Sequence, residues 1–138
     1  MMIGVGVYVK NSADAVEFYK KVFGLELGYH VKNADGSYFH SELYKDGKEV
    51  LSVVENKEEI PVDNIVCLGY TFESESEVRR AYDLLRNGGK VRTPLGPLPW
   101  SPCAANVVDK FGVWWFLTVA QHQPSEDFTP ENAEYLDL

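Results

Sequence analysis

Imidazole is the side chain best suited to metal binding or proton transfer near neutral pH, and the sequence contains three histidines, His30, His40 and His122. His40 comes two residues before Glu42. Residues two apart in a strand project from the same face, which is the arrangement that shared coordination of a divalent metal requires. His40 is therefore the histidine to weigh first as a chemical group.

The turn expected at Asp46-Gly47 favours a structural role for His40 instead. A two-residue turn there pairs His40 with Val53 and Ser41 with Ser52. We expect Ser52 to face a cavity, so this pairing turns His40 toward the covering helices.

The other reactive side chains form no recognisable catalytic motif. Neither Cys67 nor Cys103 has a second cysteine at CxxC spacing, so both are expected to be buried thiols. His30 has no evident partner and is expected on the surface of an edge strand, and His122 lies in the C-terminal segment. The sequence has no phosphate-binding glycine loop, nucleophile elbow or HExxH motif, which leaves nucleophilic catalysis without a candidate residue.

Apolar periodicity predicts the elements that must position these groups. In the first half, strands are expected at 3–9, 25–33, 37–45 and 48–55, with a helix that begins at Asn11 or Ser12 and ends before Gly24. The second half starts with a strand at 65–72 and a helix whose capping box is Ser74 and Glu77. Strands follow at 90–92, 104–108 and 113–119, the first two separated by a proline-rich loop at 93–102.

The order of elements is the same in the two halves, which indicates duplication. We predict an α+β fold in which two βαβββ modules, residues 1–60 and 64–120, form a cupped mixed sheet around a central cavity. Residues 1–120 make one domain, and 121–138 form an acidic tail with a short helix.

Composition excludes several classes of protein. A chain of 138 residues with 45% hydrophobic and 13% aromatic residues can fill a core, which excludes general disorder. A net charge of −8 argues against binding to nucleic acid. No apolar run is long enough for a membrane helix and the N-terminus has no signal-peptide pattern, so we expect no membrane association and a cytoplasmic location.

Several segments, in this order and spacing, resemble the vicinal oxygen chelate superfamily, the glyoxalase and bleomycin-resistance group, and within it the PhnB-like branch. They are Ala15-Val16-Glu17-Phe18-Tyr19, Val22-Phe23-Gly24, Phe39-His40-Ser41-Glu42-Leu43, Gly88-Gly89-Lys90-Val91, Pro94-Leu95, Trp100 and residues 108–115. The resemblance covers residues 1–120. It implies paired βαβββ modules, a central cavity and frequently a homodimer.

The resemblance also implies a divalent metal held by His, Gln or Glu from the first and last strands of each module. The corresponding positions here are Gly4, Ser52, one of residues 67–70, and Phe116. None of them supplies an imidazole or a carboxylate, the donors that such ions prefer. We therefore expect no metal at the site and no cofactor.

Strand alternation places aromatic and hydroxyl side chains on the cavity side, the usual lining of a small-molecule site. Leu43 is expected on the same side as Phe39, and Trp100 lies among four prolines in a loop long enough to reach the cavity mouth. The predicted ligand-binding residues are Tyr8, Phe39, Ser52, Trp100, Trp114 and Phe116. The aromatic residues could instead fill the cup and leave no cavity.

The sequence thus predicts a metal-free protein that binds a small organic molecule, possibly aromatic. The alternative is a divalent-metal-dependent enzyme, of lyase, isomerase or dioxygenase type, with relocated ligands around His40 and Glu42 or Glu55. A third option is a closed cavity and a role in association. We also expect a homodimer formed through sheet edges or the acidic tail, because 50–54 and 65–70 are too apolar for exposed edges.

Overall fold

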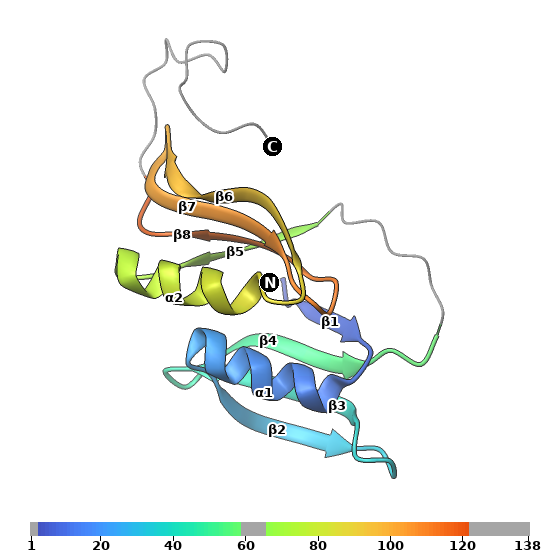
Figure 1. The fold of residues 1–138 in the computed structure, drawn as a ribbon. Helices are drawn as coiled ribbons and strands as arrows, with labels where there is room; N and C mark the ends of the chain where they lie inside the picture. The colour runs from blue at the N-terminus through green and yellow to red at the C-terminus, as the bar shows by residue number, and fades with distance from the viewer. Residues whose placement is uncertain (1–2, 59–65, 122–138) are drawn as a thin grey trace. The chain divides into compact units, whose positions relative to one another are not determined.

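The computed structural model describes residues 3–58 and 66–121. The chain divides into two compact units between Asp63 and Asn64, and each unit is described by itself. The element order in each is strand, helix and three strands (Figure 1), which confirms the predicted α+β fold of two βαβββ modules. The acidic tail predicted at 121–138 lies almost entirely outside the described residues, and the shared cavity stays a prediction.

The first unit is a four-stranded mixed sheet with one helix. Its strand order is β1-β4-β3-β2, with β1 parallel to β4 and the other pairs antiparallel. The elements are β1 (Gly6–Val9), α1 (Ser12–Phe23), β2 (Glu26–Lys32), β3 (Tyr38–Lys45) and β4 (Lys48–Glu55). The apolar stripe of α1, which includes Val16 and Tyr19, is buried, so α1 covers one face of this sheet.

The second unit repeats the arrangement, with strand order β5-β8-β7-β6. Its elements are β5 (Cys67–Thr71), α2 (Glu75–Leu85), β6 (Lys90–Leu98), β7 (Ser101–Val108) and β8 (Trp114–Thr118). The helix start is as predicted, because the Ser74 side chain accepts a hydrogen bond from the Glu77 backbone N–H. Helix α2 packs on β7 and β8, and Val107, Trp115 and Leu117 are buried on that face.

The proline-rich loop predicted at 93–102 is wrong, because most of it is strand. Strand β6 runs to Leu98, β7 begins at Ser101, and the pair Leu98 and Ser101 closes a two-residue turn that contains Trp100. Strand β6 is an edge strand, where a proline that lacks an N–H need not break a ladder hydrogen bond. Trp100 therefore lies in a tight turn and not on a long loop.

The predicted register of the β3–β4 hairpin is correct only next to the turn. Asp46 and Gly47 both have positive φ, and Lys45 pairs with Lys48 as a two-residue turn requires. The register then shifts by one residue at Val50, so that Glu42 instead of Ser41 pairs with Ser52. A β-bulge of this kind exchanges the two faces for every residue beyond it.

No helix in the described part of the chain is long and apolar enough to cross a membrane.

Candidate functional site

The face of the first sheet opposite α1, which we call its uncovered face because α1 does not pack on it, carries the polar groups. Ser41, Leu43 and Val53 are fully buried on the face that α1 covers, and Ser41 Oγ donates to the Val53 carbonyl at 2.7 Å. His40 and Glu42 alternate with these residues and therefore lie on the opposite face, with Ser52. The prediction that His40 turns toward the helices is wrong, because the bulge at Val50 reverses its side.

Glu42 is the centre of a hydrogen-bonded group that we call the Glu42 cluster, formed with His40 and Tyr44. His40 Nε2 lies 2.7 Å from Glu42 Oε2, and the Tyr44 hydroxyl donates to Glu42 Oε1 at 2.7 Å. The hydrogen bonds from His40 and Tyr44 lower the pKa of the Glu42 carboxyl, and the bond to Glu42 raises the pKa of the Tyr44 phenol. Glu42 is therefore an ionised acceptor at neutral pH.

Glycines shape the surface on both sides of the Glu42 cluster. A Cβ atom on Gly28 would come within 2.3 Å of Tyr44 Cε1, so the absence of a side chain there leaves room for the Tyr44 ring. On the other side Gly6 pairs with Ser52, which pairs with Glu42. Since Gly6 has no side chain, β1 places no side-chain atoms over the sheet surface beside Ser52 at this position.

The face of the second sheet opposite α2, which is its uncovered face in the same sense, has its own polar centre, Asn106. Its Oδ1 accepts from Trp114 Nε1 at 3.1 Å, and its Nδ2 donates to Thr93 Oγ1 at 3.3 Å. The Cys67 thiol also lies 3.8 Å from Asn106 Oδ1. Burial raises the pKa of that thiol, which makes Cys67 a poor nucleophile.

The two centres occupy equivalent positions in the duplicated modules. In the first sheet Gly6, Ser52 and Glu42 stand in one row across β1, β4 and β3. In the second sheet the row across β5, β8 and β7 is Gly69, Phe116 and Asn106. Sequence reasoning missed Asn106, although it is the one polar residue within the apolar run 103–108 of β7.

The structure divides the six predicted ligand residues between the two units. Tyr8, which is 67% exposed, and Ser52 lie on the uncovered face of the first sheet. Phe39 is 66% exposed at an irregularity in the β2–β3 pairing, and its expected companion Leu43 is instead fully buried on the covered face. Trp114 and Phe116 share the uncovered face of the second sheet, whereas Trp100 is in the β6–β7 turn.

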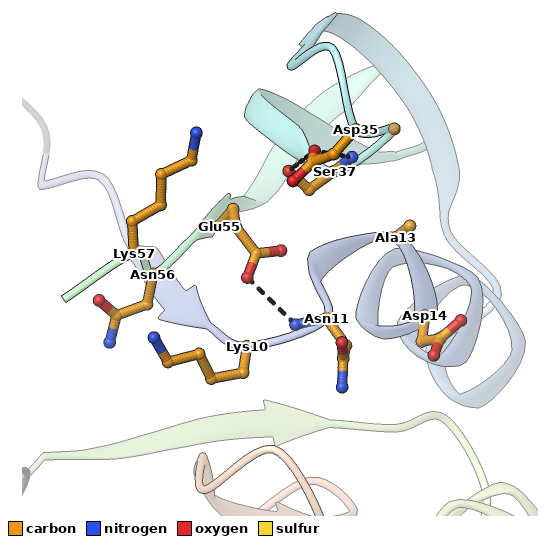
Figure 2. Close-up of a pocket in the computed structure, with 10 residues that line it drawn as sticks. Lys10, Asn11, Ala13, Asp14, Asp35, Ser37, Glu55, Asn56 and Lys57 are labelled. Carbon is orange, nitrogen blue, oxygen red and sulfur yellow. Dashed lines mark hydrogen bonds between the residues drawn. The ribbon is translucent and has the colours of Figure 1, made fainter. Parts of the chain in front are cut away.

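Glu55 holds the start of α1 and does not join His40. Glu55 is the last residue of β4 and lies on the face that α1 covers. Its Oε1 accepts hydrogen bonds from the backbone N–H and the hydroxyl of Ser12, both at 2.8 Å. Oε2 accepts from the Asn11 N–H at 3.2 Å (Figure 2). A carboxylate here caps the helix and complements its dipole, so the suggested pairing of Glu55 with His40 is wrong.

A groove of about 580 Å³ lies beside this cap in the first unit. Figure 2 shows Lys10 and Lys57 on one side of it and Asp14 on the other. Ser37 donates its N–H and hydroxyl to Asp35 and lowers the pKa of that carboxyl. Because the lining mixes both signs of charge, the groove favours no particular ion.

The residues present do not fit the metal site that the family resemblance implies. Gly4, Ser52 and Phe116 supply no imidazole or carboxylate, and neither does Cys67–Thr71. The Cys67 thiol is half-buried and not fully buried as predicted, whereas Cys103 is buried. Within residues 3–58 and 66–121, no three His, Cys, Asp or Glu side chains are grouped as a metal would need. His40 and Glu42 are two possible ligands, but they already bond to each other.

Comparison with known proteins agrees with this fold. The family model of the Glyoxalase/Bleomycin resistance protein/Dioxygenase superfamily matches residues 3–117. Protein YjdN of Escherichia coli (strain K12) is 24% identical over 143 residues, which covers 86% of this chain and 95% of YjdN.

Solved structures are similar over the same region. The "putative 3-demethylubiquinone-9 3-methyltransferase, PhnB protein" of Bacillus cereus has a TM-score of 0.76 and 23% identity, and the match covers 87% of this chain and all (100%) of PhnB. The fosfomycin resistance protein FosX of Listeria monocytogenes, solved with Mn(II) and sulfate, has a TM-score of 0.64 and 12% identity, over 87% of this chain and 90% of FosX. At these identities the structures are evidence of the fold alone.

Proposed function

Because this chain belongs to the Glyoxalase/Bleomycin resistance protein/Dioxygenase superfamily, we propose that it binds a small organic molecule on the uncovered face of its first sheet, without a metal. The observation that carries this proposal is the Glu42 cluster, an ionised acceptor held by two hydrogen bonds on an uncovered face. Binding sites typically combine a few fixed polar groups of this kind with aromatic surface.

The neighbouring residues supply the aromatic surface. Tyr8 and Tyr29 are 67% and 63% exposed, and the Tyr29 ring centroid lies 6.0 Å from that of His40. Large aromatic groups that remain exposed beside a polar cluster are suited to packing against a planar ligand. Glu42 then accepts a hydrogen bond from a donor on that ligand, and the open surface at Gly6 gives the ligand room.

A small-molecule screen by ligand-observed NMR tests this function on the full-length chain. Planar molecules with a hydrogen-bond donor are expected to bind the wild-type chain and to bind Glu42→Gln about fivefold more weakly, since a charged acceptor is lost. Glu17→Gln is the matched control, because Glu17 is an exposed carboxylate on α1 that pairs with Lys20, on the helix and away from the Glu42 cluster. A screen without hits, or hits that E42Q and E17Q weaken equally, would reject the proposal.

A metal-dependent enzyme is the second candidate, and one observation favours it. His40 and Glu42 share a face within hydrogen-bond distance, and a metal could replace the bond between them. In that case, elemental analysis of protein purified without chelator gives near-stoichiometric metal, and His40→Ala removes it. Our proposal predicts that the purified wild-type chain contains little metal.

A further inference from the structure

Arg92 places a guanidinium over the uncovered face of the second sheet. Its central carbon lies 4.0 Å from the centre of the Trp114 ring. Trp114 alternates with Trp115, which is buried on the α2 side and donates to Asp109 at 2.9 Å. Trp114 therefore projects from the opposite face, and the charge of Arg92 lies on that face as well.

Three features fix this guanidinium in place. The β6–β7 register shifts between the pairs of Val91 and Thr93, so Arg92 is the unpaired extra residue, and such bulges re-aim side chains. The guanidinium stacks on an indole, a favourable cation–π contact. The indole itself is held by its hydrogen bond to Asn106. Trp114 thus positions Arg92, and one face of its ring is occupied by the guanidinium.

The surroundings leave Arg92 available to a ligand. Within the described ranges 3–58 and 66–121, no carboxylate forms an ion pair with it. Phe116 stands one step along the same face of β8 and is partly exposed. Its partner in β5 is Gly69, where an added Cβ would meet nothing within 4 Å. The Arg92 cation on Trp114 and the Phe116 ring therefore lie on the same face of the sheet, and no side chain at Gly69 fills the space beside Phe116.

We propose that the uncovered face of the second sheet binds a small molecule of its own, whose carboxylate group is bound by Arg92 and whose planar apolar part packs against Phe116. This inference rests on the proposed small-molecule binding and extends it to an aromatic or similarly planar carboxylate on the second sheet. A guanidinium presents two parallel N–H donors that match the two carboxylate oxygens. Prior stacking on Trp114 lowers the conformational entropy that Arg92 loses on binding.

The test compares benzoate with benzamide, which has nearly the same shape and no charge, by NMR titration of the full-length chain. We expect wild type to bind benzoate more tightly than benzamide. Arg92→Gln is expected to weaken benzoate about tenfold and to leave benzamide unchanged. Arg86→Gln is the matched control, because Arg86 also lies over an aromatic ring, Tyr82, but at the end of α2 and paired with Asp83.

Equal affinity of wild type for the two probes overturns the inference, as does benzoate binding that R92Q leaves intact or that R86Q weakens equally. Absence of benzoate binding to wild type also overturns it. The proposed function is judged separately, by the wider screen. Screen hits that Glu42→Gln weakens and Glu17→Gln does not uphold it even when wild type shows no preference for benzoate.

Discussion

Glu42 accepts hydrogen bonds on both carboxylate oxygens, and both donors lie on its own strand, β3. The sequence alone indicates that His40 and Glu42 share a face, because they are two residues apart. It does not indicate which face, because that depends on a bulge at Val50 that no turn signal reveals. The contribution of Tyr44 is hidden in the same way, since it depends on the space left by Gly28.

The hydrogen bonds on Glu42 predict an acid-sensitive contribution to stability. The folded-state pKa lies below the ordinary carboxyl value, so this contribution is present above that value and is lost as the pH falls through the folded-state pKa. A carbon-13 NMR titration of side-chain carboxyls should show Glu42 titrating below 4.5. Tyr44→Phe should raise that pKa, whereas Tyr29→Phe should not. A Glu42 titration that Y44F leaves unchanged would contradict the arrangement.

Most helices and strands could be predicted from sequence patterns, but some features of the strands could not. Helices and most strand positions follow from periodicity and capping, as the bond between Glu77 and Ser74 illustrates. The proline-rich segment does not, because a proline on an edge strand breaks no pairing and the sequence does not say which strand is at the edge. Glu55 is also unpredictable locally, since it caps a helix that begins 43 residues earlier in the chain.

Gly28 in β2 packs closely against Tyr44 in β3, so we expect even a methyl group at Gly28 to lower the stability of the fold. Gly28→Ala puts a methyl group against the Tyr44 ring, so it should destabilise the fold by about 1–3 kcal/mol and weaken the Tyr44–Glu42 bond. Gly69→Ala, also in a strand but with nothing within 4 Å, should change the unfolding free energy by less than about 0.5 kcal/mol. Urea denaturation measures both. Equal effects of the two substitutions would argue against the described position of Tyr44.

The whole molecule consists of two modules with the same order of helices and strands. Gly6 and Gly69 are 63 residues apart, as are the buried helix residues Tyr19 and Tyr82. The repeat is visible in the order of elements, and the structure adds that Glu42 and Asn106 hold the same place in their modules. The equivalent polar positions have therefore diverged to a carboxylate in one module and a carboxamide in the other.

Self-association remains a prediction at this scale. The segment 50–54 is interior, in β4, as its apolar character suggests. Among the described strands, β5 has only β8 as a hydrogen-bonded neighbour. We expect a homodimer, which light scattering at micromolar concentration measures directly. A monomeric mass for the full-length chain would contradict this. A dimer that persists in a chain ending at Ala120 would exclude only a contribution from the acidic tail.

We propose that the chain binds its ligand with its own side chains and needs no metal. Calorimetric titration of the strongest ligand from the screen tests this most directly, with the chain treated with EDTA in one cell and supplied with Mn²⁺ or Zn²⁺ in another. We expect the two affinities to agree within about twofold. Binding that occurs only after metal is added would contradict it.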